Sequence, residues 1–491
     1  MTTLLDAPGV QTLPTVAVRL GGSQLSAGAA ASLGPVRIRC EASRPAACEV
    51  DFAVDTETGT VAPGDELTVT VDGTRLFSGE VVATERRLGP DRQSRLLVRG
   101  FDASHKLRNR TDVTTHTDLT VAGLAEALAG HAGLGVDAAE DGPRRGILLQ
   151  AGESDLTLLN RCCAAAGLWW RLDGTTLCLR APDPESVRTV GWGTELIEAV
   201  LGQDATGPDG PVRALSWDPA TRRGVDGASG GGGSGSGSGR TILAPLLEDS
   251  SLAEALANAE AGRRDAGARW VRAVLRGDAD WRPGSGLRLT DDPTGATYLL
   301  AGVEHVIDAV SGWVTLVDSR PTPEPQVTSG GLSLLPGVVT DVDDPEAAGR
   351  VRVRFEVLGD TGSDWLPVLG LGASHDKGFT CQPDVGDTVA VLQPADAYGH
   401  GIVLGGIQTG AADDAAGVHD GSVRRMGLST PDGQRLALDR DTDAATLRNK
   451  AGSRLEITET GVILHAEADL TISAPGRRLL IRADIVDFER G

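Results

Sequence analysis

The feature of this 491-residue sequence that most restricts its fold is a strict alternation near the C-terminus. Apolar residues occupy every second position from Val462 to Ala474, and the alternation resumes from Leu479 to Ile485 after Pro475-Gly476. A period of two places these side chains on one face of β-strands. The segment from Leu428 onward is too short to cover that face with a core of its own.

We therefore expect the apolar face to be buried against other copies of the chain. Three copies wound into a triangular β-prism would bury it, and some six strand layers would give a rod about 30 Å long. The predicted trimer core consists of Val462, Leu464, Leu470, Ile472, Leu479, Ile481 and Ile485.

A second alternation lies within Leu334–Gln408. Val351, Val353 and Phe355 alternate with three arginines, and further short apolar runs are separated by Gly-Asp and Pro-Asp turns. About five short strands in this length are typical of a small closed barrel, because closure leaves no unpaired strand edge.

Four motifs in this segment carry a family resemblance. They are Gly337–Asp341, Gly349–Phe355, Pro383–Val389 and Val403–Gly405. In this order and spacing they resemble the OB-fold barrel of the VgrG spike family, which forms the central spike of type VI secretion systems, phage-like contractile injection systems and tailed-phage baseplates. The resemblance implies a structural spike.

The chain before the barrel reads as short strands with three helices. Helices are predicted over Leu119–His131, with Thr120 as a cap, over Ser154–Ala166, capped by Ser154 and ended at Gly167, and over Leu252–Trp270, capped by Ser250 or Ser251. The dipeptide Asp72-Gly73 predicts a hairpin turn. Pro63–Asp65, Leu76–Glu80 and Arg99–Asp102 resemble the hub domain that precedes the barrel in VgrG proteins.

The predicted fold is mainly β. It combines an N-terminal hub domain of two β-barrel-like subdomains with a few helices, an OB-fold barrel and a C-terminal intertwined trimeric β-helix or β-prism. The predicted domains are hub residues 1–224 and 241–326, a flexible Gly/Ser-rich insert at 225–240, the barrel at 327–408, a connector at 409–427 and the needle at 428–491. The sequence leaves open whether the insert is native or engineered.

Charge and motif content exclude several functions. A formal net charge of -22 disfavours a nucleic-acid partner, although OB folds often bind oligonucleotides and Arg350, Arg352 and Arg354 form a basic strip. The barrel segment itself holds 11 acidic and 4 basic residues, so we expect these arginines to pair with carboxylates. The sequence shows neither a signal peptide nor an apolar run long enough for a transmembrane helix.

No catalytic, metal or cofactor site is predicted. The six cysteines are expected to be reduced, and the eight histidines show no metal-ligand spacing. His465 is expected to be a solvated surface residue. Some spikes of this family carry hydrolase domains, so a type VI secretion or phage tail spike with cell-wall hydrolase activity is the alternative, but the connector is too short for such a module.

The resemblance also implies partners. We expect a homotrimer that meets an inner tube protein and baseplate components at the hub end and a PAAR-type tip protein at the C-terminal end, with an effector cargo left open. Val486, Asp487, Phe488 and Glu489 are the predicted tip-binding residues. The short tail favours a phage-derived extracellular-type system. We expect synthesis in the bacterial cytoplasm and assembly into a phage tail-like particle, whose release the sequence does not decide.

Overall fold

The computed structural model describes residues 13–54, 60–89, 94–204, 210–218, 223–230, 239–244, 250–320, 332–373, 377–394, 399–408 and 417–489. The chain forms two compact units, which divide between Ile407 and Gln408. No described helix is both long and apolar enough to cross a membrane.

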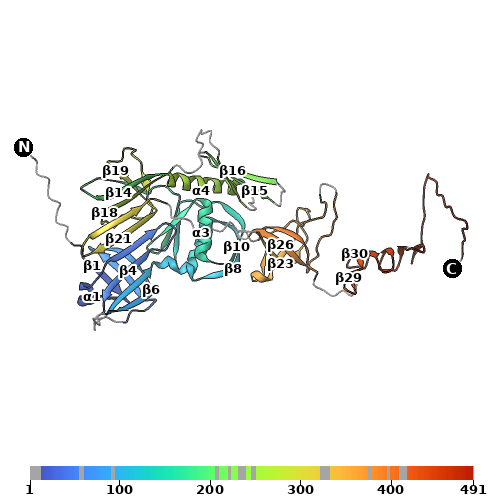
Figure 1. Ribbon diagram of the computed structural model, residues 1–491, viewed down its shortest axis with the longest axis horizontal. Helices are drawn as coiled ribbons and strands as arrows, with labels where there is room; N and C mark the ends of the chain where they lie inside the picture. The colour runs from blue at the N-terminus through green and yellow to red at the C-terminus, as the bar shows by residue number, and fades with distance from the viewer. Residues whose placement is uncertain are drawn as a thin grey trace, which may run out of the picture. The chain divides into compact units, whose positions relative to one another are not determined.

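One eleven-stranded sheet joins the two halves of the hub (Figure 1). In spatial order its strands are β14 (Leu196–Gln203), β18 (Arg269–Arg276), β22 (Gly312–Asp318), β21 (Gly302–Asp308), β3 (Val36–Glu41), β4 (Ala47–Ala53), β7 (Ser94–Phe101), β6 (Thr74–Leu88), β5 (Glu66–Val71), β1 (Val16–Leu20) and β2 (Ser23–Gln24). The halves meet where β21 pairs antiparallel with β3, with His305 opposite Ile38. Residues far apart in the sequence therefore share one hydrogen-bonded ladder.

Each half of the hub keeps its own apolar core. Ile38, Phe52 and Leu67 lie in the core of the first half, and the short helix α1 (Ala27–Ala31) contributes Ala29. Leu275 and Trp281 lie in the core of the second half. The second half is completed by β13 (Ser186–Val190), β19 (Ser285–Leu289) and β20 (Tyr298–Leu299).

The predicted hairpin at Asp72-Gly73 is confirmed. It connects β5 to β6, and the φ angles of Asp72 and Gly73 are 47° and 83°. Positive φ at both turn residues matches the right-handed twist of the paired strands, and aspartate followed by glycine adopts it readily.

A third core contains two of the predicted helices, α2 (Val121–His131) and α3 (Asp155–Ala166). Both predicted N-caps are confirmed: the hydroxyls of Thr120 and Ser154 each accept a hydrogen bond, of 3.2 Å, from a first-turn amide. Gly167 ends α3 with a φ of 71°. The remaining elements of this region are η1 (Ala103–Arg108), β8 (Thr111–Thr120), β9 (Gly135–Ala138), β10 (Arg144–Ser154), β11 (Trp169–Asp173) and β12 (Thr176–Arg180).

The ends predicted for the third helix are wrong. Helix α4 spans Ser250–Ala268, so Ser250 begins the helix instead of preceding it. Arg269 and Trp270 belong to β18, where pairing with β14 replaces helical hydrogen bonds. The helix packs through Ala253 and Ala257 on β15 (Val212–Asp218), β16 (Arg223–Ala228) and β17 (Arg240–Leu243).

The barrel is a five-stranded sheet closed by single residue bridges. Its strands, in spatial order, are β25 (Thr361–Gly362), β24 (Arg352–Phe355), β23 (Leu332–Asp341), β26 (Thr388–Pro394) and β27 (Ile402–Gly406), and η2 (Glu356–Leu358) follows β24. Leu366 bridges to Val351 and Val368 bridges to Val403, which links the two sides of the sheet. The predicted alternation is confirmed, since Val351, Val353 and Phe355 are buried in the barrel core.

The arginines of the alternation are engaged within the chain. Arg350 contacts the buried Asp344 at 2.7 Å, and Arg354 pairs with Asp360. The guanidinium of Arg352 lies 4.9 Å from the ring centroid of Trp365. Two of the three therefore pair with carboxylates, as the sequence predicts.

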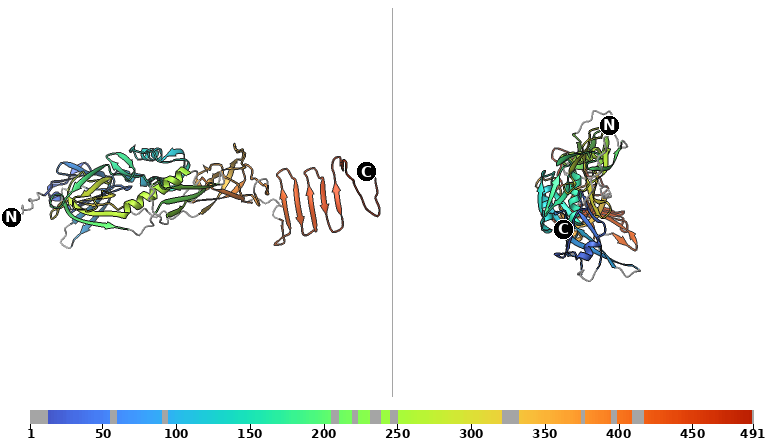
Figure 2. Two further views of the ribbon diagram at one scale, coloured as in Figure 1. Left: turned by 90° about the horizontal axis from the view of Figure 1, so that it is seen from above. Right: turned by 90° about the vertical axis from the view of Figure 1, so that its left-hand side faces the viewer.

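The second unit contains a meander of five antiparallel strands (Figure 2). They are β30 (Arg425–Ser429), β31 (Arg435–Asp439), β32 (Ala444–Arg448), β33 (Arg454–Ile457) and β34 (Val462–His465), and the hairpin of β28 (Val418–His419) and β29 (Ser422–Val423) precedes them. Within the described residues 466–489 no strand occurs.

The domain limits expected from the sequence stay predictions. Residues 225–228 of the predicted insert lie in β16 and Arg240 begins β17, whereas residues 231–238 lie outside the described residues. The same holds for residues 321–331 around the predicted start of the barrel and for residues 409–416 of the connector.

Burial of His305 in the hub predicts a pH-dependent stability. Burial lowers the pKa of His305 from 6.5 to about 4, and its Nδ1 lies 3.0 Å from the hydroxyl oxygen of Thr315. The unfolded chain binds the proton more readily, so the free energy of unfolding falls as the pH drops from 6.5 to 4, by up to about 3 kcal/mol.

We expect His305→Gln to remove this part of the pH dependence in thermal unfolding of the hub, measured between pH 4 and 7. His131→Gln is the matched control, because the His131 side chain is 43% exposed. An unchanged pH slope in His305→Gln would contradict the assignment.

Candidate functional site

The needle sheet, defined as β30 to β34, has one apolar face. Its strand register aligns two rows of side chains that run across all five strands. The first row is Met426, Leu438, Ala445, Ile457 and Val462, and the second row is Leu428, Leu436, Leu447, Leu455 and Leu464. Members of the two rows are two residues apart within each strand, so both rows lie on the same face.

This apolar face is uncovered in the single chain. Nine of its ten members are large apolar side chains, and all nine are exposed, from 38% for Leu455 to 70% for Met426. A contiguous exposed apolar surface of this extent marks a protein interface. The face is thus the candidate interaction surface of the second unit.

The structure places two of the predicted trimer-core residues, Val462 and Leu464, in these rows. The other five are exposed and lie beyond β34, where the described chain forms no strand: Leu470, Ile472, Leu479, Ile481 and Ile485. Among the described strands the outer edge of β34 has no partner, so no described strand holds the following residues in a ladder. Their place in a trimer core stays a prediction.

Sequence reasoning missed most of the apolar face. Met426, Leu428, Leu436, Leu438, Leu447, Leu455 and Ile457 were not predicted as core residues. Their signal was present as two apolar residues at i and i+2 in each strand, repeated after a four- or five-residue turn. Each pair of apolar residues is too short to predict a strand by itself, unlike the longer alternation that follows in the sequence.

The opposite face of the needle sheet is polar. Arg425 donates to Asp439 at 2.7 Å, and Arg454 contacts Glu456 at 3.2 Å. The hydrogen bond from Arg425 lowers the pKa of Asp439 below its usual value. These pairs keep the polar face charged, while the apolar face carries no charged side chain.

The predicted tip-binding residues lie at the end of the described chain. Phe488 is 92% exposed and Val486 is exposed as well. Val486, Asp487, Phe488 and Glu489 belong to no strand, so the structure shows an accessible aromatic side chain but no preformed pocket around it.

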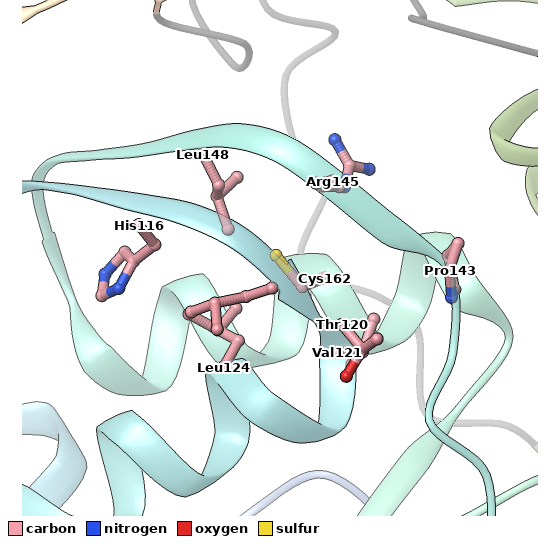
Figure 3. Close-up of a pocket in the computed structure, with 9 residues that line it drawn as sticks. His116, Thr120, Val121, Leu124, Pro143, Arg145, Leu148 and Cys162 are labelled. Carbon is pink, nitrogen blue, oxygen red and sulfur yellow. The ribbon is translucent and has the colours of Figure 1, made fainter.

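A small pocket lies in the hub (Figure 3). It is lined by His116, Leu119, Thr120, Val121, Leu124, Pro143, Arg145, Leu148 and Cys162. It encloses about 260 Å³, solvent-open space included. Burial raises the pKa of Cys162, which disfavours the reactive thiolate.

Metal binding finds no support in the described part of the chain. There, no three His, Cys, Asp or Glu side chains are grouped as metal ligands. The described cysteines are free thiols, and burial raises the pKa of Cys40 to about 12. His465, expected to be a solvated residue, is 43% exposed and lies 2.9 Å from Glu467.

The apolar face yields a direct prediction. In Leu447→Asp a charge would replace a leucine of the apolar face in the middle of the sheet, and covering that charge without a partner is unfavourable. We expect this variant to lose self-association, measured as the mass of the full chain by light scattering. Thr446→Asp is the matched control, because Thr446 lies on the polar face of the same strand; equal loss in both variants would contradict the assignment of faces.

Two family models match the sequence. The model described as the type VI secretion system/phage-baseplate injector OB domain matches residues 335–407. The model described as the Alg8 N-terminal domain matches residues 46–267. No curated protein matches the sequence.

Solved structures share the fold at low sequence identity. The E. coli c3393 protein, described as a type VI secretion component structurally similar to phage T4 tail proteins gp27 and gp5, is 14% identical, with 80% of this chain and 99% of that chain covered and a TM-score of 0.56. A chain of the Francisella PdpA-VgrG complex is 9% identical, with 93% and 80% covered and a TM-score of 0.57. The 43 kDa tail protein of prophage MuSo2 from Shewanella oneidensis is 14% identical, with 63% and 98% covered and a TM-score of 0.51.

These likenesses agree with the domain that the family model identifies in the barrel. Residues 335–407 form an injector OB domain, and the chain has the fold of VgrG-type spike proteins.

Proposed function

We propose that this chain is the homotrimeric central spike and baseplate hub of a contractile injection system. The observation that carries the proposal is the uncovered apolar face of the needle sheet, together with the injector OB domain at residues 335–407. A spike needs a stiff element that is stable only in its assembled form. The needle sheet fits this need, because one copy leaves its apolar face in water.

The dimensions of the needle sheet support three copies. The longest strands of the needle sheet have five residues and make it about 17 Å wide, and three such sheets form a triangular prism whose faces lie about 5 Å from the axis. This is half of the usual spacing of about 10 Å between packed sheets, so leucine side chains fill the interior. Four sheets would lie about 8 Å from the axis and leave a hollow.

The hub is proposed to dock on the inner tube. Its two halves have separate cores within one sheet, and three chains would supply six such halves. That number matches a hexameric tube layer. In this proposal the tube protein and baseplate components bind at the hub, and an effector cargo is an optional passenger.

A PAAR-type tip protein is proposed to bind at Val486–Glu489. The exposed Phe488 ring and the outer edge of β34, which pairs with no described strand, support this proposal. An exposed strand edge offers backbone donors and acceptors to a partner, and an aromatic side chain supplies apolar contact area.

The proposed role is mechanical and involves no reaction. Contraction of a sheath would drive the tube, and the prism would transmit the force to the target envelope. We propose that the protein is made in the bacterial cytoplasm and acts in a phage tail-like particle of the extracellular type.

The mass of the full chain in solution tests the trimer. We expect about three times 50.7 kDa by light scattering, and we expect truncation after Gln408 to weaken the assembly, because it removes the apolar face. A full chain that remains a monomer at micromolar concentration would contradict the proposal.

Deletion of residues 486–491 tests the tip. We expect the deletion to abolish co-purification with a PAAR-type protein while the mass of the assembly stays unchanged. Phe488→Ala should weaken the same interaction, because it removes the exposed ring. Unchanged tip binding in the deletion variant would overturn the assignment of these residues.

A further inference from the structure

The needle sheet has two margins, where its strands end and its turns lie. At β32 and β33 these two margins carry opposite charge. Asp443 precedes the first residue of β32, Arg448 is its last residue, and Lys450 lies in the turn that follows. Because β33 runs antiparallel to β32, the turn after β33 returns to the side of Asp443 and places Glu459 there. We define Arg448 and Lys450 as the basic margin, and Asp443 and Glu459 as the acidic margin.

These four side chains have no ion-pair partner within the described residues 417–489, whereas several charges elsewhere in the sheet do. Arg424 pairs with Asp441 at 3.2 Å, and Arg425 pairs with Asp439. No ion pair joins Arg448, Lys450, Asp443 or Glu459 to any described residue. The two margins are about 17 Å apart across a five-residue strand, so they cannot pair with each other in one chain.

The basic margin also contains an unfavourable arrangement. Arg448 lies directly opposite Arg435 on one neighbouring strand and Arg454 on the other. Like charges in directly opposite positions destabilise a sheet. Arg454 is offset by Glu456. An anionic group from outside the chain would relieve the repulsion at Arg448.

A second copy of this chain supplies such a group. Rotation about the long axis of the needle carries the basic margin of one sheet to the acidic margin of the next, so the contact is head-to-tail and closes on itself. If one copy were inverted end to end with its apolar face still inward, its two margins would exchange sides, and a basic margin would meet a basic margin. Charge complementarity thus selects parallel copies in register.

We propose that Arg448 and Lys450 of each copy pair with Asp443 and Glu459 of the next copy, and that this pairing fixes the axial register of the needle. The inference rests on the proposed trimer. It adds the contacts between the margins of neighbouring copies, at the corners of the prism, that hold the copies at the same height along the axis. The apolar rows alone define the register weakly, because leucine follows leucine along the second row. Exposed ion pairs contribute little affinity each, but they discriminate between arrangements.

Charge reversal in the full chain tests the inference. Arg448→Glu with Lys450→Glu gives both margins negative charge, and Asp443→Lys with Glu459→Lys gives both margins positive charge. We expect each double variant to raise the apparent dissociation constant of the assembly by about tenfold at low salt, measured by light scattering on dilution. We expect the quadruple variant, in which the two margins exchange their charges, to return to within about threefold of the unmodified chain.

The controls separate this inference from the proposed trimer. Arg75→Glu with Lys377→Glu changes the net charge by the same amount in the first unit, and it should leave the dissociation constant unchanged. Double variants with an unchanged dissociation constant would overturn the proposed pairing between margins. A quadruple variant that associates as weakly as either double variant would also overturn it. A monomeric unmodified chain would instead overturn the proposed trimer.

Discussion

Burial of one apolar sheet face is the constraint on which the rest of this structure depends. A single-layer meander of five short strands can satisfy its internal backbone hydrogen bonds, but it leaves its apolar face in water. The hydrophobic effect then favours association, because apolar area buried against another chain is removed from water just as area buried within one chain is. A needle built in this way links folding to assembly, which suits a spike that must form only as part of a larger particle.

The first unit is organised by the opposite principle. Its cores are covered within the chain: four hub cores and a barrel core are closed by residues of the same molecule. The hub and the barrel also contact each other directly, since His400 Nε2 lies 3.2 Å from the carbonyl oxygen of Ile147, in β10. The first unit thus buries its cores within one chain, whereas the needle sheet needs other copies to cover its apolar face. Truncation after Gln408 should therefore leave the first unit folded.

Local signals made much of the first unit predictable from the sequence. Thr120 and Ser154 cap helices through their own hydroxyls, Asp72-Gly73 forms its turn within two residues, and Val353 is buried as its alternation indicates. Long-range pairing was not predictable in this way. The ladder between β3 and β21 and the start of β18 at Arg269 depend on strands distant in the sequence. In the candidate site, Val462 and Leu464 were identified, but the aligned rows of the four earlier strands emerge only from their register.

Amide hydrogen exchange along the needle of the full chain tests the account most directly. In a covered prism, the amides of β30 to β34 are both hydrogen-bonded and shielded, so they should be protected nearly as strongly as those of the barrel core. Protection should disappear when the chain is diluted until it dissociates. Needle amides that exchange as fast as an unfolded peptide at micromolar concentration, while the hub remains protected, would contradict the claim that other copies cover the apolar face.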